Sequence, residues 1–164
     1  MVTEGSSRPG MVLSVRSLWP ARVIDYDESG ALVVRVGEGF LLSWPLRPYE
    51  DDPTLHFLVT AHGCWGSVRT TVETWGGDGL DTFLASLAED FRGWQGERTW
   101  HSLCHDLTLS AEHRSGGYVR LGWAISDGAP REEWRFETST WHEAGEDMRT
   151  LAADIRAFIA SVAD

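Results

Sequence analysis

Residues 80–123 read LDTFLASLAEDFRGWQGERTWHSLCHDLTLSAEHRSGGYVRLGW, a helix pattern followed by a Gly/Trp corner and a hairpin pattern. Over residues 80–91 the apolar side chains recur at steps of three and four, so they share one face of a helix that can pack on a sheet. We expect Asp78 or Asp81 to cap its N-terminus and Gly93 to end it. The apolar face comprises Leu80, Phe83, Leu84, Leu87, Ala88 and Phe91.

A β-hairpin is predicted next. Apolar and polar residues alternate from Leu107 to His113, and they alternate again from Val119 to Ile125. Between the two runs, Ser115-Gly116-Gly117 provides glycines that tolerate the positive φ of a tight turn. The pattern indicates two antiparallel strands, each buried on one face.

The preceding segments predict a meander of short strands separated by turns that contain Gly or Pro. The short apolar segment over 11–19 fits a first strand. We expect strands over 22–27, 32–36, 40–44, 55–61 and 65–75, a proline-rich loop over 45–53 and a flexible tail over 1–10. On the last of these strands, Val68 and Val72 share one face, and Trp65, Arg69 and Trp75 share the other.

The C-terminal part predicts one more strand over 132–141, followed by a second helix. Apolar residues from Met148 to Val162 fall at helical spacing, and Glu146 and Asp147 lie near the positive end of the helix dipole. Many strands with only two helices indicate an α+β class. We therefore expect a single α+β domain over residues 11–164, with an antiparallel twisted sheet or partial sandwich of seven to eight strands and two packed helices.

Composition limits the possible partners. The 164-residue chain carries 25 Asp plus Glu against 14 Lys plus Arg, a net charge of −11 with His neutral. This sign opposes the clustered cations of nucleic-acid binders, so we expect no nucleic-acid partner. It favours association with a basic protein, although solubility is an alternative reason for an acidic composition.

Cys64 and Cys104 are the only two cysteines. The first ten residues lack the apolar core of a signal peptide, and no apolar run reaches the roughly 18 residues that a membrane span needs. We therefore predict a cytoplasmic protein with both thiols reduced and no membrane contact. The oligomeric state is left open.

The corner resembles a motif of an uncharacterised bacterial family. Residues 91–100 read FRGWQGERTW, and 107–113 read LTLSAEH. They are similar to the pattern Trp-Arg-Gly-Trp-x-Gly-Glu-x-x-Trp, followed by Leu-x-Leu-x-Ala-x-His, of a domain-of-unknown-function family, number 6228. Phe91 stands where that pattern has its first Trp. The resemblance implies a fold more than an activity. In layout alone, the chain also resembles WapI-type immunity proteins, which bind and neutralise a toxin.

The sequence contains three sets of residues of catalytic or metal-binding type, and their spacing favours none of them. His101 and His105 would share one strand face while Cys104 points to the other, so we expect no metal and no cofactor. A Cys-His nucleophile would need a positive site around Cys64 or Cys104, which the sequence does not indicate. Carboxylate pairs such as Asp51/Asp52 are adjacent in sequence and would point apart.

Two sets of residues remain as candidate sites. Trp65, Arg69 and Trp75 form a candidate partner-binding surface, because exposed Trp and Arg are enriched in binding hot spots. They can equally be covered by other parts of the fold. Trp94, Glu97, Trp100 and His113 form a candidate pocket between sheet and helix, in which Glu97 is either an acid or an ion-pair partner of Arg92 or Arg98.

These observations favour a non-enzymatic binding protein, of the immunity-protein kind, that engages a basic protein through an acidic surface bearing tryptophans. The alternative is a small enzyme or a small-molecule-binding protein with the Trp-lined pocket.

Overall fold

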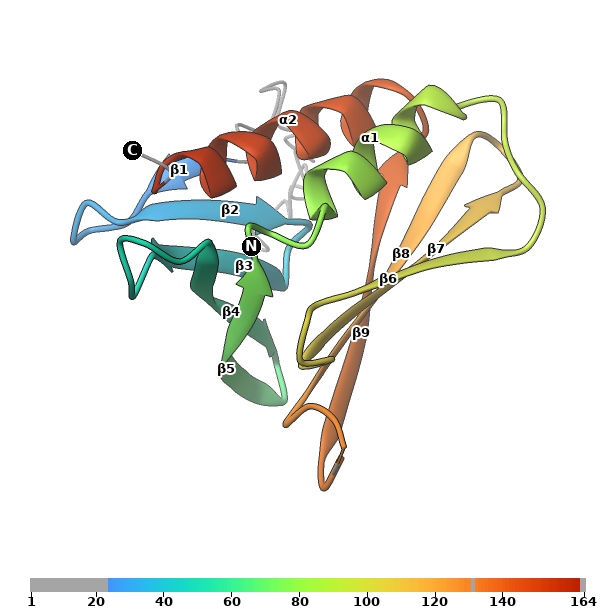
Figure 1. Cartoon of the computed structure of the whole chain (residues 1–164). Helices are drawn as coiled ribbons and strands as arrows, with labels where there is room; N and C mark the ends of the chain where they lie inside the picture. The colour runs from blue at the N-terminus through green and yellow to red at the C-terminus, as the bar shows by residue number, and fades with distance from the viewer. Residues whose placement is uncertain (1–23, 131, 163–164) are drawn as a thin grey trace, which may run out of the picture.

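The computed structural model describes residues 24–130 and 132–162, and it confirms the α+β class (Figure 1). These residues form nine strands and two helices. The strands make two antiparallel sheets that do not close into a barrel. The expected tail over 1–10 and the expected strand over 11–19 lie outside the described residues.

Both sheets are meanders, in which each strand pairs with the next along the chain. The first sheet comprises β1 (Ile24–Tyr26), β2 (Leu32–Val36), β3 (Phe40–Leu46), β4 (Thr54–Gly63) and β5 (Gly66–Trp75). The second sheet comprises β6 (Glu97–His101), β7 (Leu107–Arg114), β8 (Tyr118–Ser126) and β9 (Arg135–Glu143). Short connections of polar and glycine residues favour this order, because consecutive antiparallel strands can be joined by tight turns.

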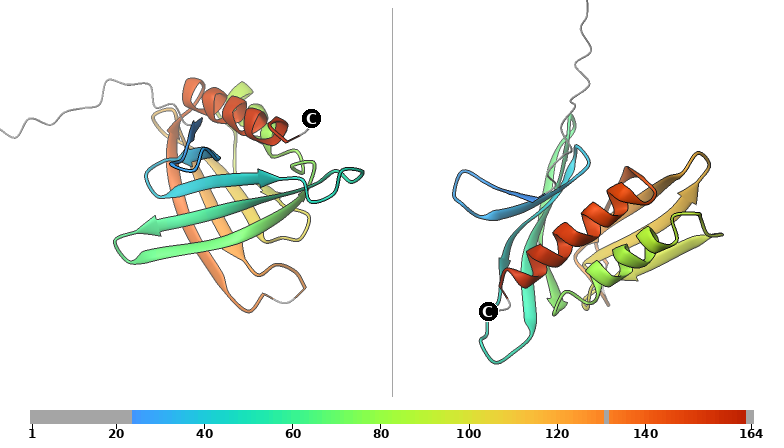
Figure 2. Two further views of the ribbon diagram at one scale, coloured as in Figure 1. Left: turned by 90° about the vertical axis from the view of Figure 1, so that its left-hand side faces the viewer. Right: turned by 90° about the horizontal axis from the view of Figure 1, so that it is seen from above.

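The helices α1 (Leu80–Glu89) and α2 (Glu146–Ala160) pack on each other and lie across the wedge between the two sheets (Figures 1 and 2). One continuous core fills this wedge. Phe40 of β3 stacks on Trp123 of β8 with ring centroids 4.5 Å apart, and Phe57 of β4 meets Phe158 of α2 at 5.7 Å. The helices therefore cover the inner face of each sheet and leave the outer faces open.

Strand β5 crosses one end of the second sheet. At its start, the ring of Trp65 lies 4.8 Å from that of Phe136 on β9. Near its end, the Glu73 N–H donates to the carboxylate of Asp106 at 3.0 Å. Beyond it, the Asp78 carbonyl accepts a bond from Trp100 Nε1 at 2.8 Å. These contacts join β5 and the segment that follows it to the second sheet.

Several local expectations were wrong. Strand β6 occupies part of the corner that was expected to be irregular, which accounts for a strand beyond the predicted seven to eight. Neither expected acidic cap forms, since Gly79 is the N-cap of α1 without a side-chain bond. Asp78 instead accepts N–H bonds from Trp75 and Leu103. Helix α1 ends at Glu89, so Phe91 lies outside it and is exposed.

Candidate functional site

The outer face of the second sheet carries a hollow of about 680 Å³. Strand register explains its shape. One row across the four strands consists only of small residues, and we call it the small-residue row: Thr99, Ser110, Gly122 and Ser139. The parallel row on one side holds Glu97, Glu112, Arg120 and Trp141, and the row on the other side holds His101, Thr108, Ala124 and Glu137. The first of these rows is made of large side chains, and the second has them only at its two ends, so they border a floor of small residues.

Gly122 sets the depth of this floor. A Cβ atom at this position would lie 2.6 Å from the hydroxyl oxygen of Ser110, so only glycine leaves the present Ser110 rotamer undisturbed. Neighbouring Thr108 and Ser110 are half-buried, and their hydroxyl groups can donate and accept hydrogen bonds. The floor is therefore shallow, polar and suited to backbone or other polar groups.

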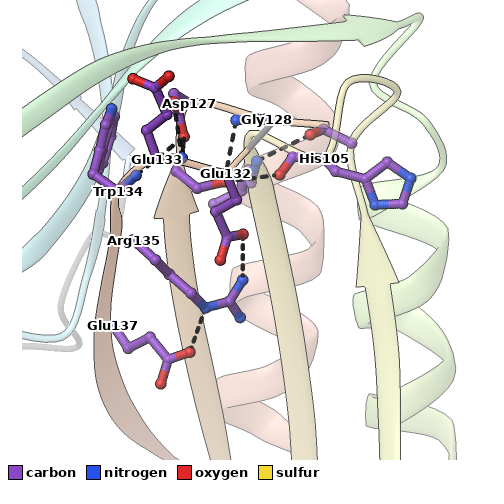
Figure 3. Close-up of polar contacts among 11 residues, drawn as sticks. His105, Asp127, Gly128, Glu132, Glu133, Trp134, Arg135 and Glu137 are labelled. Carbon is purple, nitrogen blue, oxygen red and sulfur yellow. Dashed lines mark hydrogen bonds and ion pairs between the residues drawn. The ribbon is translucent and has the colours of Figure 1, made fainter. Parts of the chain in front are cut away.

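Arg135 and its partners form one corner of the hollow (Figure 3). The guanidinium contacts the carboxylates of Glu137 at 2.5 Å and Glu132 at 3.2 Å. These two carboxylates raise the pKa of Arg135, and the hydrogen bond that Arg135 donates to Glu137 is the largest cause. The cation is thus already paired within the chain.

The loop before β9 is held by a side chain at its start (Figure 3). The Asp127 carboxylate accepts the Glu133 N–H at 3.0 Å and the Trp134 N–H at 3.4 Å. Ser126 donates to the His105 carbonyl at 3.2 Å and accepts the Gly128 N–H at 3.3 Å. These bonds fix where β9 begins and hence where Arg135 and Glu137 lie.

Of the two carboxylates that line the hollow, Glu97 is the one that has no cationic partner among the described residues. Glu112, directly opposite on β7, pairs with Arg114 at 2.6 Å and Arg120 at 3.8 Å. Arg98, a sequence neighbour, pairs instead with Asp90 at 2.7 Å. Among the described residues we find no ion pair or hydrogen bond of the Glu97 side chain. A cation from outside would meet an unpaired charge there.

The predicted Trp-lined pocket is divided between two faces of the second sheet. Trp94 and His113 contact edge to face at 5.4 Å, and Arg98 lies 4.8 Å above the Trp94 ring. Trp100 is buried on the same inner side, whereas Glu97 is exposed on the outer side. The alternation of β6 separates them, and neither expected ion pair of Glu97 is present.

The predicted partner surface extends along β5. Trp65 and Trp75 are each 55% exposed, and Arg69 is exposed and donates to Thr60 at 3.2 Å. Trp65 belongs to the hairpin turn before β5, and Trp75 ends the ten-residue strand, so the two indoles are on the order of 30 Å apart. The three residues are exposed, but they do not form one compact patch.

The histidines and thiols take a different arrangement from the one expected. Residues 102–106 form a turn, and the rings of His101 and His105 stack at 3.8 Å. Cys104 lies 3.9 Å from the Glu73 carboxylate. Burial and the carboxylates of Glu73, Asp106 and Asp78 raise the pKa of the Cys104 thiol, which opposes thiolate formation. Within 24–130 and 132–162, no three metal-ligand side chains converge.

The two acids that line the hollow are too far apart to act on one bond. Glu97 and Glu137 lie on the outermost strands, and Glu137 shares its row with His101, four residues beyond Glu97. Strand spacing and rise place their Cα atoms on the order of 20 Å apart. Paired catalytic carboxylates are about 5–9.5 Å apart in glycoside hydrolases. Glu97 and Glu137, the two carboxylates that line the hollow, therefore do not have the spacing of such a pair.

The structure defines an α+β protein with two antiparallel meanders and an open, polar hollow on one sheet. The chain belongs to DUF6228, a family of unknown function whose sequence profile matches residues 36–162. No curated protein matches the chain. Across the described residues, no helix has the length and apolar character needed to span a membrane.

Proposed function

We propose that this chain is a non-enzymatic binding protein that engages a basic protein partner through the hollow of the second sheet. The observation that carries the proposal is the unpaired Glu97 carboxylate beside an open row of small polar residues. The net charge of −11 supports it, because an acidic surface accelerates encounter with a basic partner. We further propose a neutralising role in the bacterial cytoplasm, because the element order predicted from the sequence resembles that of WapI-type immunity proteins.

The composition allows a sharp test. All 14 cationic side chains are arginine, and the chain contains no lysine. A carbodiimide joins carboxylates to primary amines, so cross-links from its Asp and Glu side chains to lysine must involve another protein. We expect cross-linking in a bacterial extract to join Glu97 to lysines of a basic protein at low salt, and high salt to suppress it.

Matched variants localise the contact. Glu97→Gln and Glu89→Gln remove the same charge, but Glu89 lies on α1 at the covered side of the sheet. The proposal requires Glu97→Gln to lower partner capture while Glu89→Gln leaves it unchanged. Capture that is insensitive to salt and equal in both variants would refute it. Trp75→Ala tests the alternative that Trp65, Arg69 and Trp75 of the first sheet hold the partner.

A second candidate is a small-molecule-binding protein or a small enzyme. The volume of the hollow favours it, since ligand sites commonly measure about 300–1,000 Å³. Its hydroxyl floor fits a polar ligand rather than an apolar one. A metabolite that raises the melting temperature of the wild type, but not of Gly122→Val, would favour this function over a protein partner.

A further inference from the structure

Strand β6 is an edge strand with an accessible free side. It pairs only with β7, in a regular register without a bulge. An open groove lies along this edge, because its lining includes Thr99 and His101 from the outer face together with Trp100 from the inner face. The five residues of β6 include neither Pro nor Lys, which commonly protect an edge from another strand.

The unpaired backbone groups of this edge can be assigned. Ser102 N–H donates to the Leu107 carbonyl at 2.9 Å, in the register that continues the β6–β7 ladder. Backbone groups alternate in direction along an antiparallel strand, so those of Trp100 and Arg98 also point toward β7. The N–H and C=O groups of Glu97, Thr99 and His101 therefore point away from β7. Within the described residues these groups have no backbone partner.

The sequence of β6 complements itself in the antiparallel direction. With Thr99 opposite Thr99 of a second copy, Glu97 faces His101 and Arg98 faces Trp100. A Thr–Thr pair is among the favourable cross-strand pairs, and no two like charges face each other. With Thr99 on the two-fold axis, each of the other contacts occurs twice, once from each copy.

We propose that a second copy of this chain pairs with β6, antiparallel and centred on Thr99. The outward groups of Glu97, Thr99 and His101 then form three doubly hydrogen-bonded pairs between the copies. The two four-stranded sheets become one sheet of eight strands. The small-residue row continues across the axis, since Thr99 is its last member on β6 and lines both the hollow and the edge groove.

The charge of the chain gives the dimer a distinctive salt dependence. Two copies of net charge −11 repel each other, and salt screens this repulsion. Self-association is therefore expected to strengthen as salt rises, whereas binding of a basic partner weakens. Because salt has opposite effects on the two interactions, a test of the dimer and a test of the proposed function can fail independently of each other.

The first experiment measures molar mass by light scattering over a dilution series at low and high salt. We expect a shift from 18.3 kDa toward twice that mass at high concentration, favoured by salt. Thr99→Pro removes an N–H that points away from β7, so proline is compatible with the monomer's edge strand. It should abolish the dimer with an unchanged circular dichroism spectrum, and Thr99→Val should retain it. A chain that stays monomeric throughout, or a dimer unaffected by Thr99→Pro, overturns the proposal.

A disulfide test locates the axis. In a Cys64→Ser, Cys104→Ser background, Thr99→Cys places two thiols opposite each other at about 5.5 Å between Cα atoms, within the range of disulfides. With oxidised glutathione as the electron acceptor, this variant should form a covalent dimer. The control Ser110→Cys has its thiol on β7, one strand farther from the axis, and should stay monomeric. Equal cross-linking of the two variants contradicts the register.

Discussion

Thr140→Val should destabilise the protein through the loss of one buried hydroxyl. The Trp123 indole N–H donates to Thr140 Oγ1 at 2.9 Å, and Trp123 is 1% exposed. An indole nitrogen can only donate, so the Thr140 hydroxyl accepts this bond, and the same hydroxyl lies 2.8 Å from His142 Nε2. Valine keeps the shape of threonine but leaves the indole N–H without an acceptor.

The expected cost is about 2 kcal/mol, since an unsatisfied buried donor costs roughly 1–3 kcal/mol. For a chain of this size the loss corresponds to a fall in melting temperature of about 4–8 °C. Urea unfolding followed by circular dichroism measures the free energy directly, and an unchanged m value would show that the unfolded state is comparable.

Thr138→Val is the matched control for this prediction. Thr138 also lies on β9, directly opposite Trp123 in the register, but its hydroxyl has no hydrogen bond among the described residues. We expect its substitution to change stability by less than about 0.5 kcal/mol. Equal losses in the two variants would refute the role of the Trp123–Thr140 bond.

Three other perturbations follow from the polar contacts. Burial lowers the pKa of His142, and the charge of Asp147 partly opposes this shift, so the unfolded chain binds more protons than the folded chain below about pH 6.5. Urea titrations should therefore show the free energy of unfolding falling as the pH drops below that value. The fall should be less steep in His142→Gln. Asp106→Ala removes the acceptor of the Glu73 N–H and should lower the free energy of unfolding by about 2–3 kcal/mol, as measured by chemical unfolding. The control Asp90→Ala removes only an exposed ion pair and should lower it by at most about 1 kcal/mol. Burial raises the pKa of Asp154, whose Oδ2 has no partner in the described chain. The folded state therefore binds more protons than the unfolded state, and the protein loses stability as the pH rises above about 3.8. Asp154→Asn removes this ionisation and should raise the melting temperature at pH 7.

The sequence predicted the elements whose signals are local. Hydrophobic periodicity gave both helices, and alternation gave the hairpin of β7 and β8. Strand β6 was missed because the glycines at 93 and 96 dominate the corner, while the five residues that follow are too few for a clear period. Its pairing with β7 is a tertiary contact that local propensity does not record.

The strand pattern does not decide which tryptophans are buried. Trp44 and Trp134 fall within predicted strands, yet they are 55% and 40% exposed, whereas Trp100 and Trp123 are buried. Trp44 has a positive φ at the bulge of β3, and Trp134 precedes the first residue of β9. Strand alternation cannot assign a face to a residue at a bulge or outside the strand.

The hollow could not be predicted because its floor comes from four strands. Thr99, Ser110, Gly122 and Ser139 meet only once the register of all three strand pairs is known. One local signal existed, since Gly122 interrupts a strand of otherwise good β-formers, and a glycine within a strand often marks a close approach to the backbone. That signal marks a position without revealing its neighbours.

The glycine at 122 gives a second test of the proposal that the outer face binds a partner. Glycine within a strand costs roughly 0.5–1 kcal/mol relative to alanine, and nothing in the fold demands it here, because Gly122 has no positive φ. The one close atom is the end of the Ser110 side chain, which can rotate away. Gly122→Val should therefore fold with equal or greater stability while it fills the floor of the hollow. If the variant still cross-links to the basic partner through Glu97 with wild-type efficiency, the floor does not contact the partner; if it unfolds, glycine is there for packing.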